Sequence, residues 1–306
     1  MEQPADLPPA AGVVDGAQRP KVIYVMGQGK SGSTILGVAL GNCDDVFFAG
    51  ELVTWLLASG RPVLGGAERV RFWRAVREQV EGAQELFGSA AYMTLERAAS
   101  LVRADRWPKR RGLRPRYRRV TESLYRTLAA ESGCRHIVDT SHLPLRAREL
   151  QGMDIDLYLV FLVRDVEAVV ASHASHIKRH EAAERRIRVA ATVGRLWVGY
   201  ALSLAVFLRQ PADRRMLLRH EDFIADPEGV LRAILRMSGA PERIPDLAHL
   251  KTGIPLVANL MVREPEVALR PTAAQPHRAS RTMRALQRPW ELVIKRLGGV
   301  GDRAGR

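Results

Sequence analysis

Residues 27–34 form a short loop that combines glycines, a lysine and several hydroxyl groups in the order Gly-Gln-Gly-Lys-Ser-Gly-Ser-Thr. The apolar run 21–26 before this loop predicts a strand, and the run 35–42 after it has the composition of a helix. Backbone N–H groups in the first turn of a helix lack intrahelical partners, and the positive end of the helix dipole lies there. Because glycine lets the backbone approach a ligand closely, the loop is predicted to bind a phosphate-like anion.

The spacing of Gly27 and Gly32 matches the first two glycines of G-x-x-x-x-G-K-[ST], the motif that binds nucleoside triphosphates. In that motif a lysine follows the second glycine and reaches the terminal phosphates, but here Ser33 occupies its position. The lysine of this loop, Lys30, lies two residues before the second glycine. The loop therefore has the shape of a P-loop with its lysine displaced, and a P-loop nucleotide-dependent kinase is kept as an alternative function.

The segment 30–34 resembles the K-S-G-[ST]-T loop of the sulfotransferase family, which binds the 5′-phosphosulfate of 3′-phosphoadenosine 5′-phosphosulfate (PAPS). The resemblance implies that Lys30 neutralises charge on the bridging oxygen as 3′,5′-ADP departs, and that Ser31 modulates Lys30. It also implies that Ser33 and Thr34 hold the 5′-phosphate. The cofactor-binding residues that follow from it in this loop are Gly29, Lys30, Ser31, Gly32, Ser33 and Thr34.

A second match to the same family lies at the continuous apolar run 157–163, which predicts a buried parallel strand. Arg164 follows this run, and Ser172 lies eight residues later in a helical pattern. In the family, an arginine and a serine at this spacing hold the 3′-phosphate of PAPS. Arginine suits the task because its planar guanidinium donates two hydrogen bonds to one phosphate. The alternative is a salt-bridged arginine and a solvated serine.

Two further segments resemble the family and extend the resemblance over most of residues 20–265. Residues 219–223, Arg-His-Glu-Asp-Phe, are similar to its R-Y-E-D-L stretch, with His220 in place of the tyrosine that contributes to the adenine pocket. Residues 258–263 are similar to its G-N-x-x-R loop, although the glycine is absent. This second similarity implies that Arg263 contacts the 3′-phosphate.

Transfer to a hydroxyl group requires a general base within hydrogen-bonding reach of that hydroxyl. Glu51 lies in Gly-Glu-Leu after the short apolar run 46–48, which resembles the segment that carries the base in carbohydrate-type and bacterial sulfotransferases. His142 lies in 139–144, Asp-Thr-Ser-His-Leu-Pro, which resembles both the K-T-H-L-P motif with its histidine base and the V-D-S-S-K segment of the carbohydrate-type enzymes. Glu51 is favoured as the base, and His142 is the alternative. If neither is the base, the Glu51 carboxylate would interact with the positive end of a helix dipole, and His142 would make a capping or backbone hydrogen bond at a strand end.

By analogy with phosphoryl transfer, the expected mechanism is an in-line displacement at sulfur that depends on positioning and charge stabilisation, and it requires no metal. His173, His176 and His180 have helical spacing that could bind zinc. The adjacent Lys178 and Arg179 would repel a cation, and the glutamate of H-E-x-x-H is missing. No metal site is predicted.

The net charge of +14 raises the possibility of a nucleic-acid partner, with the densest basic run at 103–119. Most basic residues are arginine, however, which together with the abundant alanine is typical of a GC-rich bacterial genome. No aromatic RNA-binding platform or zinc-finger spacing is present, so no nucleic-acid partner is predicted. A tetra-anionic cofactor accounts for part of the charge.

Residues 1–20 contain four prolines and no apolar periodicity, so they are predicted to be a disordered leader rather than a signal peptide. The apolar stretch 198–208 is too short to span a bilayer. Cys43 and Cys134 provide no disulfide framework. Golgi sulfotransferases carry an N-terminal membrane anchor, so the expectation is a cytoplasmic enzyme without a transmembrane segment.

The apolar pattern of this chain of 306 residues predicts an α/β fold of the P-loop type, with three layers, a central parallel sheet and helices on both faces. The expected strands are 21–26, 46–49, 136–139, 157–163 and 215–219. Residues 21–306 are expected to form one domain. Within it, 66–132 is expected to be a helical acceptor-binding insertion, with helical periodicity at 70–87 and 117–130, and 264–288 is a candidate lid.

The basic loop expected between those two helical stretches would clamp an anionic substrate, touch a membrane surface, or be solvated. The resulting hypothesis is a PAPS-dependent sulfotransferase that acts on a hydroxyl of a carbohydrate, glycolipid or natural product and releases 3′,5′-ADP. The alternatives are the kinase and a non-catalytic nucleotide-binding protein.

Overall fold

The computed structural model describes residues 19–29, 31–98, 107–164, 197–270, 292–293 and 296–297. Residues 1–18 of the expected leader and 271–288 of the candidate lid lie outside this set, so both stay predictions. Lys30 and Ser172 lie outside it as well.

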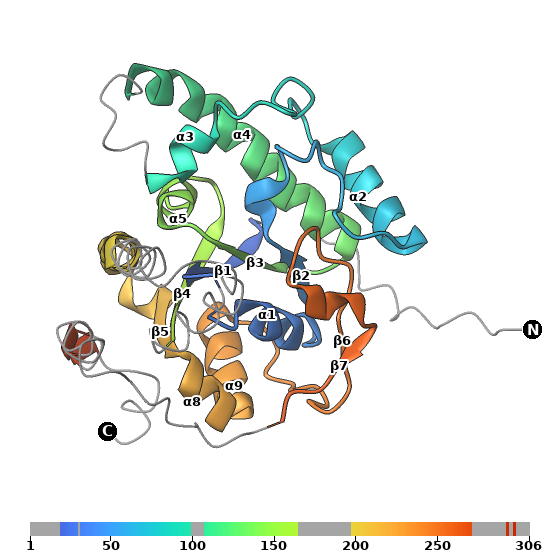
Figure 1. Ribbon diagram of the computed structural model, residues 1–306, viewed down its shortest axis with the longest axis vertical. Helices are drawn as coiled ribbons and strands as arrows, with labels where there is room; N and C mark the ends of the chain where they lie inside the picture. Colours follow the sequence, from blue (N-terminus) through green and yellow to red (C-terminus); the bar gives the residue numbers. More distant parts are fainter. Residues whose placement is uncertain are drawn as a thin grey trace, which may run out of the picture.

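In the part of the chain that the structure describes, five parallel strands form one sheet in the order β2-β3-β1-β4-β5 (Figure 1). The strands are β1 (Lys21–Gly27), β2 (Val46–Gly50), β3 (His136–His142), β4 (Asp156–Val163) and β5 (Arg215–Arg219). All five were predicted, and β3 runs beyond its predicted end because its pairing with β1 continues to His142. The chain adds strands first on one side of β1 and then on the other, and open α/β sheets bind ligands at the carboxyl ends of the strands where this reversal occurs.

Strands β1 and β4 are buried on both faces, which explains their continuous apolar sequences. In β1, Tyr24 and Met26 pack into one hydrophobic core, while Ile23 and Val25 pack into the other. Burial on both faces requires a helical layer on each side of the sheet. The predicted three-layer α/β fold is therefore confirmed.

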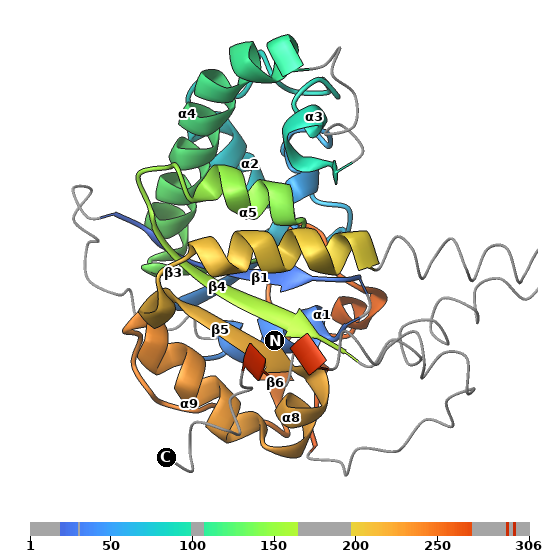
Figure 2. The same cartoon turned by 90° about the vertical axis from the view of Figure 1, so that its left-hand side faces the viewer.

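The two helical layers are visible in Figure 2. The helical residues 197–209 and α5 (Pro144–Leu150) lie on one face, together with the insertion described below. The opposite face is covered by α1 (Ser33–Gly41), α8 (His220–Ala225) and α9 (Pro227–Ser238). Asp226 caps α9, because its side chain accepts a hydrogen bond from the backbone N–H of Gly229.

The described part of 66–132 contains the helices α2 (Ala67–Gln79), α3 (Met93–Glu96) and α4 (Trp107–Ser132). Helix α2 ends at Gln79, earlier than the periodicity over 70–87 predicted.

The predicted basic loop between the two helical stretches is wrong for residues 107–116, because these residues belong to α4. Within α4, Leu113 and Tyr117 pack into the core, although Trp107 is exposed. Arg114 and Arg118 both pair with Glu149 of α5. Packing and ion pairing therefore stabilise a helix in a segment whose high charge had predicted a loop.

Residues beyond α9 return to the edge of β2. The N–H of Leu256 donates to the carbonyl of Ala49 at 2.9 Å, and the N–H of Glu51 donates to the carbonyl of Val257 at 2.8 Å. The small elements of the described chain are the 3-10 helices η1 (Leu52–Thr54), η4 (Ala212–Arg214) and η5 (Leu260–Arg263) and the antiparallel strands β6 (Leu250–Lys251) and β7 (Glu266–Val267). Among the described residues, no helix combines the length and apolar character needed to cross a membrane.

Candidate active site

The candidate site residues lie along one edge of the sheet, where all five strands end. Because the strands are parallel, their carboxyl ends meet at the same edge. In spatial order across the sheet, the residues that end or follow the strands are Glu51 after β2, His142 at the end of β3, the loop 28–32 after β1, Arg164 after β4 and His220 after β5. Sheet topology therefore brings together segments that are far apart in the sequence.

The glycine-rich loop leads from β1 into α1. Gly32 is the N-cap of α1 with φ of 93°, a left-handed conformation that favours glycine. No side chain caps this helix, and its first turn carries no acidic residue. The backbone N–H groups of that turn and the positive helix dipole are thus available to an anion.

The loop also requires glycine at its start, where Gly27 pairs with Leu162 of β4. A Cβ atom on Gly27 would lie 2.2 Å from the carbonyl oxygen of Leu162. Further along, Ser31 is fully buried, and its hydroxyl has no hydrogen-bond partner among the described residues. A buried hydroxyl without a partner inside a glycine-rich helix entry fits a site for a phosphate oxygen.

His220, the first residue of α8, contacts this loop, since a Cβ atom on Gly32 would lie 2.4 Å from Nδ1 of His220. Burial, and then the charge of nearby Arg164, lower the pKa of His220 to about 4. The imidazole is therefore neutral at neutral pH, and its buried Nδ1 has no partner within the described chain. Arg164, His220 and the loop thus gather at one place, whereas the predicted partner Ser172 lies outside the described residues.

Glu51 and His142, the two predicted alternatives for the base, lie side by side. Oε1 of Glu51 is 3.6 Å from Nε2 of His142, and the same nitrogen is 3.5 Å from Oγ of Ser33 in the first turn of α1. The Glu51 side chain is 31% exposed and that of His142 is 15% exposed. Both candidates therefore border the N-terminus of α1.

Neither Glu51 nor His142 makes the capping or backbone hydrogen bond that a purely structural role would require. Glu51 stands at the N-cap of η1, but its side chain makes no capping hydrogen bond. Nδ1 of His142 is buried without a hydrogen-bond partner in the described part of the chain. Both side chains are thus directed to each other and to the loop rather than to backbone groups.

The backbone at His142 is strained. Its φ is 65°, and the N–H of Leu143 donates to the carbonyl of Ser141 at 2.8 Å, which closes a three-residue γ-turn around the histidine. The hydroxyl of Tyr24 donates to the carbonyl of Leu143 at 2.9 Å and so holds the turn. Non-glycine residues in such conformations concentrate at functional sites, because the surrounding structure must maintain them.

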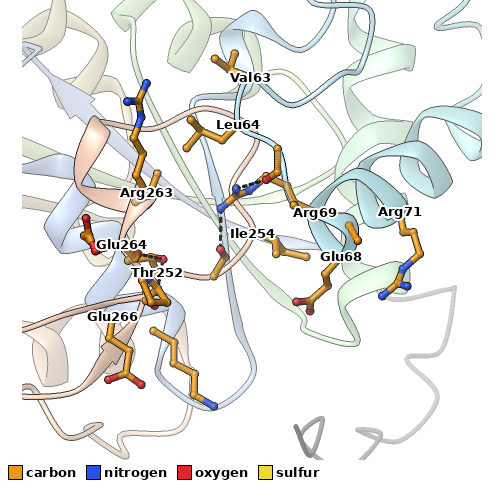
Figure 3. A pocket seen from close by; sticks show the side chains of 17 residues that line it. Val63, Leu64, Glu68, Arg69, Arg71, Thr252, Ile254, Arg263, Glu264 and Glu266 are labelled. Atoms are coloured by element: carbon orange, nitrogen blue, oxygen red, sulfur yellow. Dashed lines mark hydrogen bonds between the residues drawn. The ribbon is translucent and has the colours of Figure 1, made fainter. Parts of the chain in front are cut away.

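Arg263 takes part in a different feature. It lies in η5 and lines an open hollow of about 1190 Å³ between 63–71 and 251–266 (Figure 3). Figure 3 shows Arg69 across this hollow, where its guanidinium donates to the carbonyls of Gly65 and Gly253. None of the residues lining the hollow comes from the loop 28–34 or is Arg164. The assignment of Arg263 to a 3′-phosphate stays a prediction.

The histidines 173, 176 and 180 lie outside the described residues. Within the described ranges, no group of three or more histidine, cysteine, aspartate or glutamate side chains is arranged to hold a metal ion.

Sequence reasoning missed a buried polar cluster beneath His142, formed by Asp139 and Arg146 with groups from α3 and α4. The available signal was an aspartate at the end of an apolar strand, where a carboxylate needs buried partners. The partners themselves come from distant segments, and no spacing in the sequence identifies them.

The model described as the sulfotransferase family matches residues 20–244. Among curated protein sequences, none matches this chain.

Three solved structures are similar to the chain over most of its length. The sulfotransferase domain from the Synechococcus PCC 7002 olefin synthase is 17% identical, with a TM-score of 0.50 and coverage of 90% of this chain and 96% of that chain. The sulfotransferase domain from the curacin biosynthetic pathway is 15% identical, with a TM-score of 0.47 and coverage of 90% and 99%. A sulfotransferase from Mycobacterium tuberculosis is 20% identical, with a TM-score of 0.47 and coverage of 73% and 68%.

The family match covers the loop, the strand ends at Glu51, His142 and Arg164, and the helix α8. The structural similarity to the olefin synthase domain shows the same fold. The chain belongs to the sulfotransferase family, whose activity is the transfer of a sulfuryl group.

Proposed function

We propose that this chain transfers a sulfuryl group from PAPS to a hydroxyl acceptor and releases 3′,5′-ADP. One observation carries the proposal: along one edge of the sheet, the Glu51 and His142 pair lies on one side of the loop 28–32, and Arg164 and His220 lie on the other. The basic side chain of Arg164 therefore lies near the neutral imidazole of His220 on one side of the loop. The carboxylate of Glu51 lies next to the imidazole of His142 on the other side. The side with Arg164 suits an anionic nucleotide, and the side with Glu51 suits an acceptor hydroxyl.

The residues of this site fit the nucleotide. The uncapped N-terminus of α1, together with the buried hydroxyl of Ser31, suits a phosphate oxygen at the 5′ position. Arg164 suits the 3′-phosphate, because a guanidinium binds phosphate through two parallel hydrogen bonds. The neutral, half-buried ring of His220 suits contact with a base. When bound, PAPS supplies the sulfuryl group; by resemblance to the family, Lys30 neutralises the leaving phosphate oxygen.

Glu51 is the proposed general base. Nε2 of His142 faces both Glu51 and Ser33, and its Nδ1 is buried, so neither nitrogen is open to an acceptor. The carboxylate of Glu51 is the more exposed group of the pair. It accepts the hydroxyl proton as the acceptor oxygen forms its bond to sulfur and the bond to the leaving oxygen breaks.

The acceptor is proposed to enter beside β2 and β3, where Glu51 lies. The insertion with α2, α3 and α4 stands over this side of the sheet, which Figure 1 shows. Its size and position suit a site that recognises the acceptor, such as a hydroxyl of a carbohydrate, glycolipid or natural product.

Calorimetric titration with 3′,5′-ADP and, separately, with ATP and magnesium tests the proposal. The wild-type protein is expected to bind 3′,5′-ADP in preference to ATP, and Arg164→Ala is expected to lose this binding. The control is Arg74→Ala, which removes an exposed arginine on α2 and should leave affinity unchanged. A preference for ATP would favour the kinase alternative, and absence of binding to either nucleotide would overturn the proposal.

A further inference from the structure

Ser141 joins the two segments that carry Glu51 and His142. It is 2% exposed and lies immediately before His142 in β3. Its hydroxyl donates to Oδ1 of Asp139, and it accepts a 2.9 Å hydrogen bond from the N–H of Val53 in η1. One hydroxyl thus connects the end of β3 to the turn of helix that follows Glu51.

We propose that Ser141 is a positioning residue that sets the distance between Glu51 and His142. The proposal rests on the function proposed above, in which these two side chains form the base. Val53 lies two residues after Glu51, and Ser141 lies one residue before His142. Strands β2 and β3 are paired as far as Gly50 and Asp139. The hydrogen bond from Val53 to Ser141 therefore adds a side-chain link beyond the last paired residues, next to Glu51 and His142.

The direction of the hydrogen bonds at Ser141 is determined by its neighbours. A serine hydroxyl has one proton to donate and two lone pairs that accept. Oδ1 of Asp139 also accepts the backbone N–H of Ser141, at 2.9 Å, so this oxygen serves as an acceptor for both groups. With its proton directed to Asp139, the hydroxyl presents a lone pair to the N–H of Val53.

Asp139 is in turn held rigidly through its other oxygen. Oδ2 accepts from the hydroxyl of Tyr125 at 2.6 Å and from Nη2 of Arg146 at 3.2 Å. Burial raises the pKa of Tyr125 well above its usual value, so the phenol keeps the proton that it donates. Asp139 and Tyr125 are fully buried, and Arg146 is 3% exposed.

The same arginine connects this carboxylate to the insertion. Nη1 of Arg146 donates to Oε1 of Glu96 in α3 and to the hydroxyl of Tyr117 in α4, each at 2.8 Å. Burial raises the pKa of Glu96, although the charge of Arg146 opposes that shift. The anchor beneath Ser141 therefore extends into the helices that stand over the proposed acceptor side, and its buried hydrogen bonds restrict the movement of the groups that they join.

Removal of the Ser141 hydroxyl should loosen the pair without disturbing the nucleotide side of the site. The loop 28–32 follows β1, Arg164 follows β4, and His220 begins α8 after β5. Within the described chain, the hydroxyl of Ser141 is hydrogen-bonded to Asp139 and Val53 instead. Glu51 would remain held by Val257, and the turn at His142 by Tyr24 through Leu143. The expected defect is thus in the spacing of the pair and in turnover, not in nucleotide affinity.

The first test compares Ser141→Ala with Ser238→Ala. Ser238 is also buried, and its hydroxyl donates a single hydrogen bond, to the carbonyl of Leu235 in α9. Release of 3′,5′-ADP from PAPS, with water as the acceptor, is expected to fall about 10- to 100-fold in Ser141→Ala and to stay unchanged in Ser238→Ala. Calorimetric affinity for 3′,5′-ADP should be the same in all three proteins. Equal rates in the two variants would overturn the proposal.

The second test requires no turnover. The nitrogen-15 chemical shifts of the His142 imidazole are recorded at neutral pH with and without Glu51→Gln, first with Ser141 and then with Ser141→Ala. Glu51→Gln is expected to move the Nε2 signal when Ser141 is present and to move it less when the hydroxyl is absent. An equal response in both backgrounds would contradict the positioning role.

These two tests separate the failure of this proposal from failure of the proposed function. A protein that does not bind 3′,5′-ADP, yet shows the hydroxyl-dependent response of His142, would retain the positioning role and lose the nucleotide assignment. If Ser141→Ala does not fold, Ser141→Cys is the second variant, since a thiol is close to a hydroxyl in volume but accepts hydrogen bonds weakly. It is expected to show the same losses.

Discussion

Nε2 of His142 lies 3.6 Å from Oε1 of Glu51, although the two residues end different strands. Each was predicted separately as a candidate base, by resemblance to different branches of one family. In the structure they form a single pair that also borders Ser33 in the first turn of α1. The two candidates therefore occupy one site, with Glu51 as the proposed base and His142 as its neighbour against Ser33.

Replacement of the proposed base should affect turnover alone. Glu51→Gln keeps the size of the side chain and removes its ability to accept a proton, so release of 3′,5′-ADP from PAPS is expected to fall by about 10²- to 10⁴-fold. Calorimetric affinity for 3′,5′-ADP should not change, because Glu51 lies on the acceptor side. The control is Glu68→Gln in the exposed first turn of α2. A full rate in Glu51→Gln would transfer the role of base to His142.

The contact between Gly32 and His220 predicts a selective effect of a methyl group in the loop. Gly32→Ala combines a φ of 93° with a Cβ atom 2.4 Å from Nδ1 of His220, so loss of nucleotide binding is expected. Gly88→Ala is the matched control, because Gly88 has a φ of 70° but open space around its Cβ position. Backbone strain alone costs about 1–3 kcal/mol and should lower the free energy of unfolding of both variants.

Comparison of Gly32→Ala with Gly88→Ala separates the steric clash with His220 from the backbone strain that both variants share. Calorimetry with 3′,5′-ADP is expected to show binding by Gly88→Ala and none by Gly32→Ala. Binding by both variants would mean that the loop and His220 can move apart without consequence for the site.

The lowered pKa of His220 makes stability depend on pH. Its value of about 4 in the folded protein lies below the ordinary value of 6.5, so between these values the unfolded chain binds more protons at this residue. The contribution of His220 to the free energy of unfolding is therefore complete above pH 6.5 and is lost as the pH falls toward 4.

Urea denaturation at a series of pH values checks this dependence. The wild-type protein should lose stability between pH 6.5 and 4 more steeply than His220→Gln, which has no titrating group at this position. Parallel pH profiles for the two proteins would show that the ring is not buried in its neutral form.

Removal of the central cation of the buried cluster should be strongly destabilising. Arg146→Met leaves Glu96 and Asp139 buried without their shared partner, and loss of one member of a buried ion network costs about 3–5 kcal/mol. The comparison variant is Arg236→Met, which breaks an exposed ion pair with Glu242 and should leave the unfolding midpoint unchanged. Urea denaturation measures both. Equal midpoints would show that the cluster adds no stability.

The sequence alone determined the strands, the loop and the fold class. Strand β4 is a continuous apolar run because both of its faces are buried, and such a run is recognisable without knowledge of its neighbours. The loop 28–32 was recognisable for a similar reason, since its glycines and hydroxyls act through local backbone geometry. By contrast, the sequence predicted a loop at 107–116, because the many arginines there leave few apolar positions to indicate the first turns of α4.

Only the tertiary structure decided which of these residues meet. The distances that join Glu51 to His142, and the latter to Ser33, depend on the order of the strands across the sheet, and no spacing within one strand encodes that order. The contact of His220 with Gly32 and the hydrogen bond from Val53 to Ser141 arise in the same way. Local sequence specifies elements through backbone conformation and burial, whereas a site formed from several strand ends exists only after long-range packing has placed those ends along one edge.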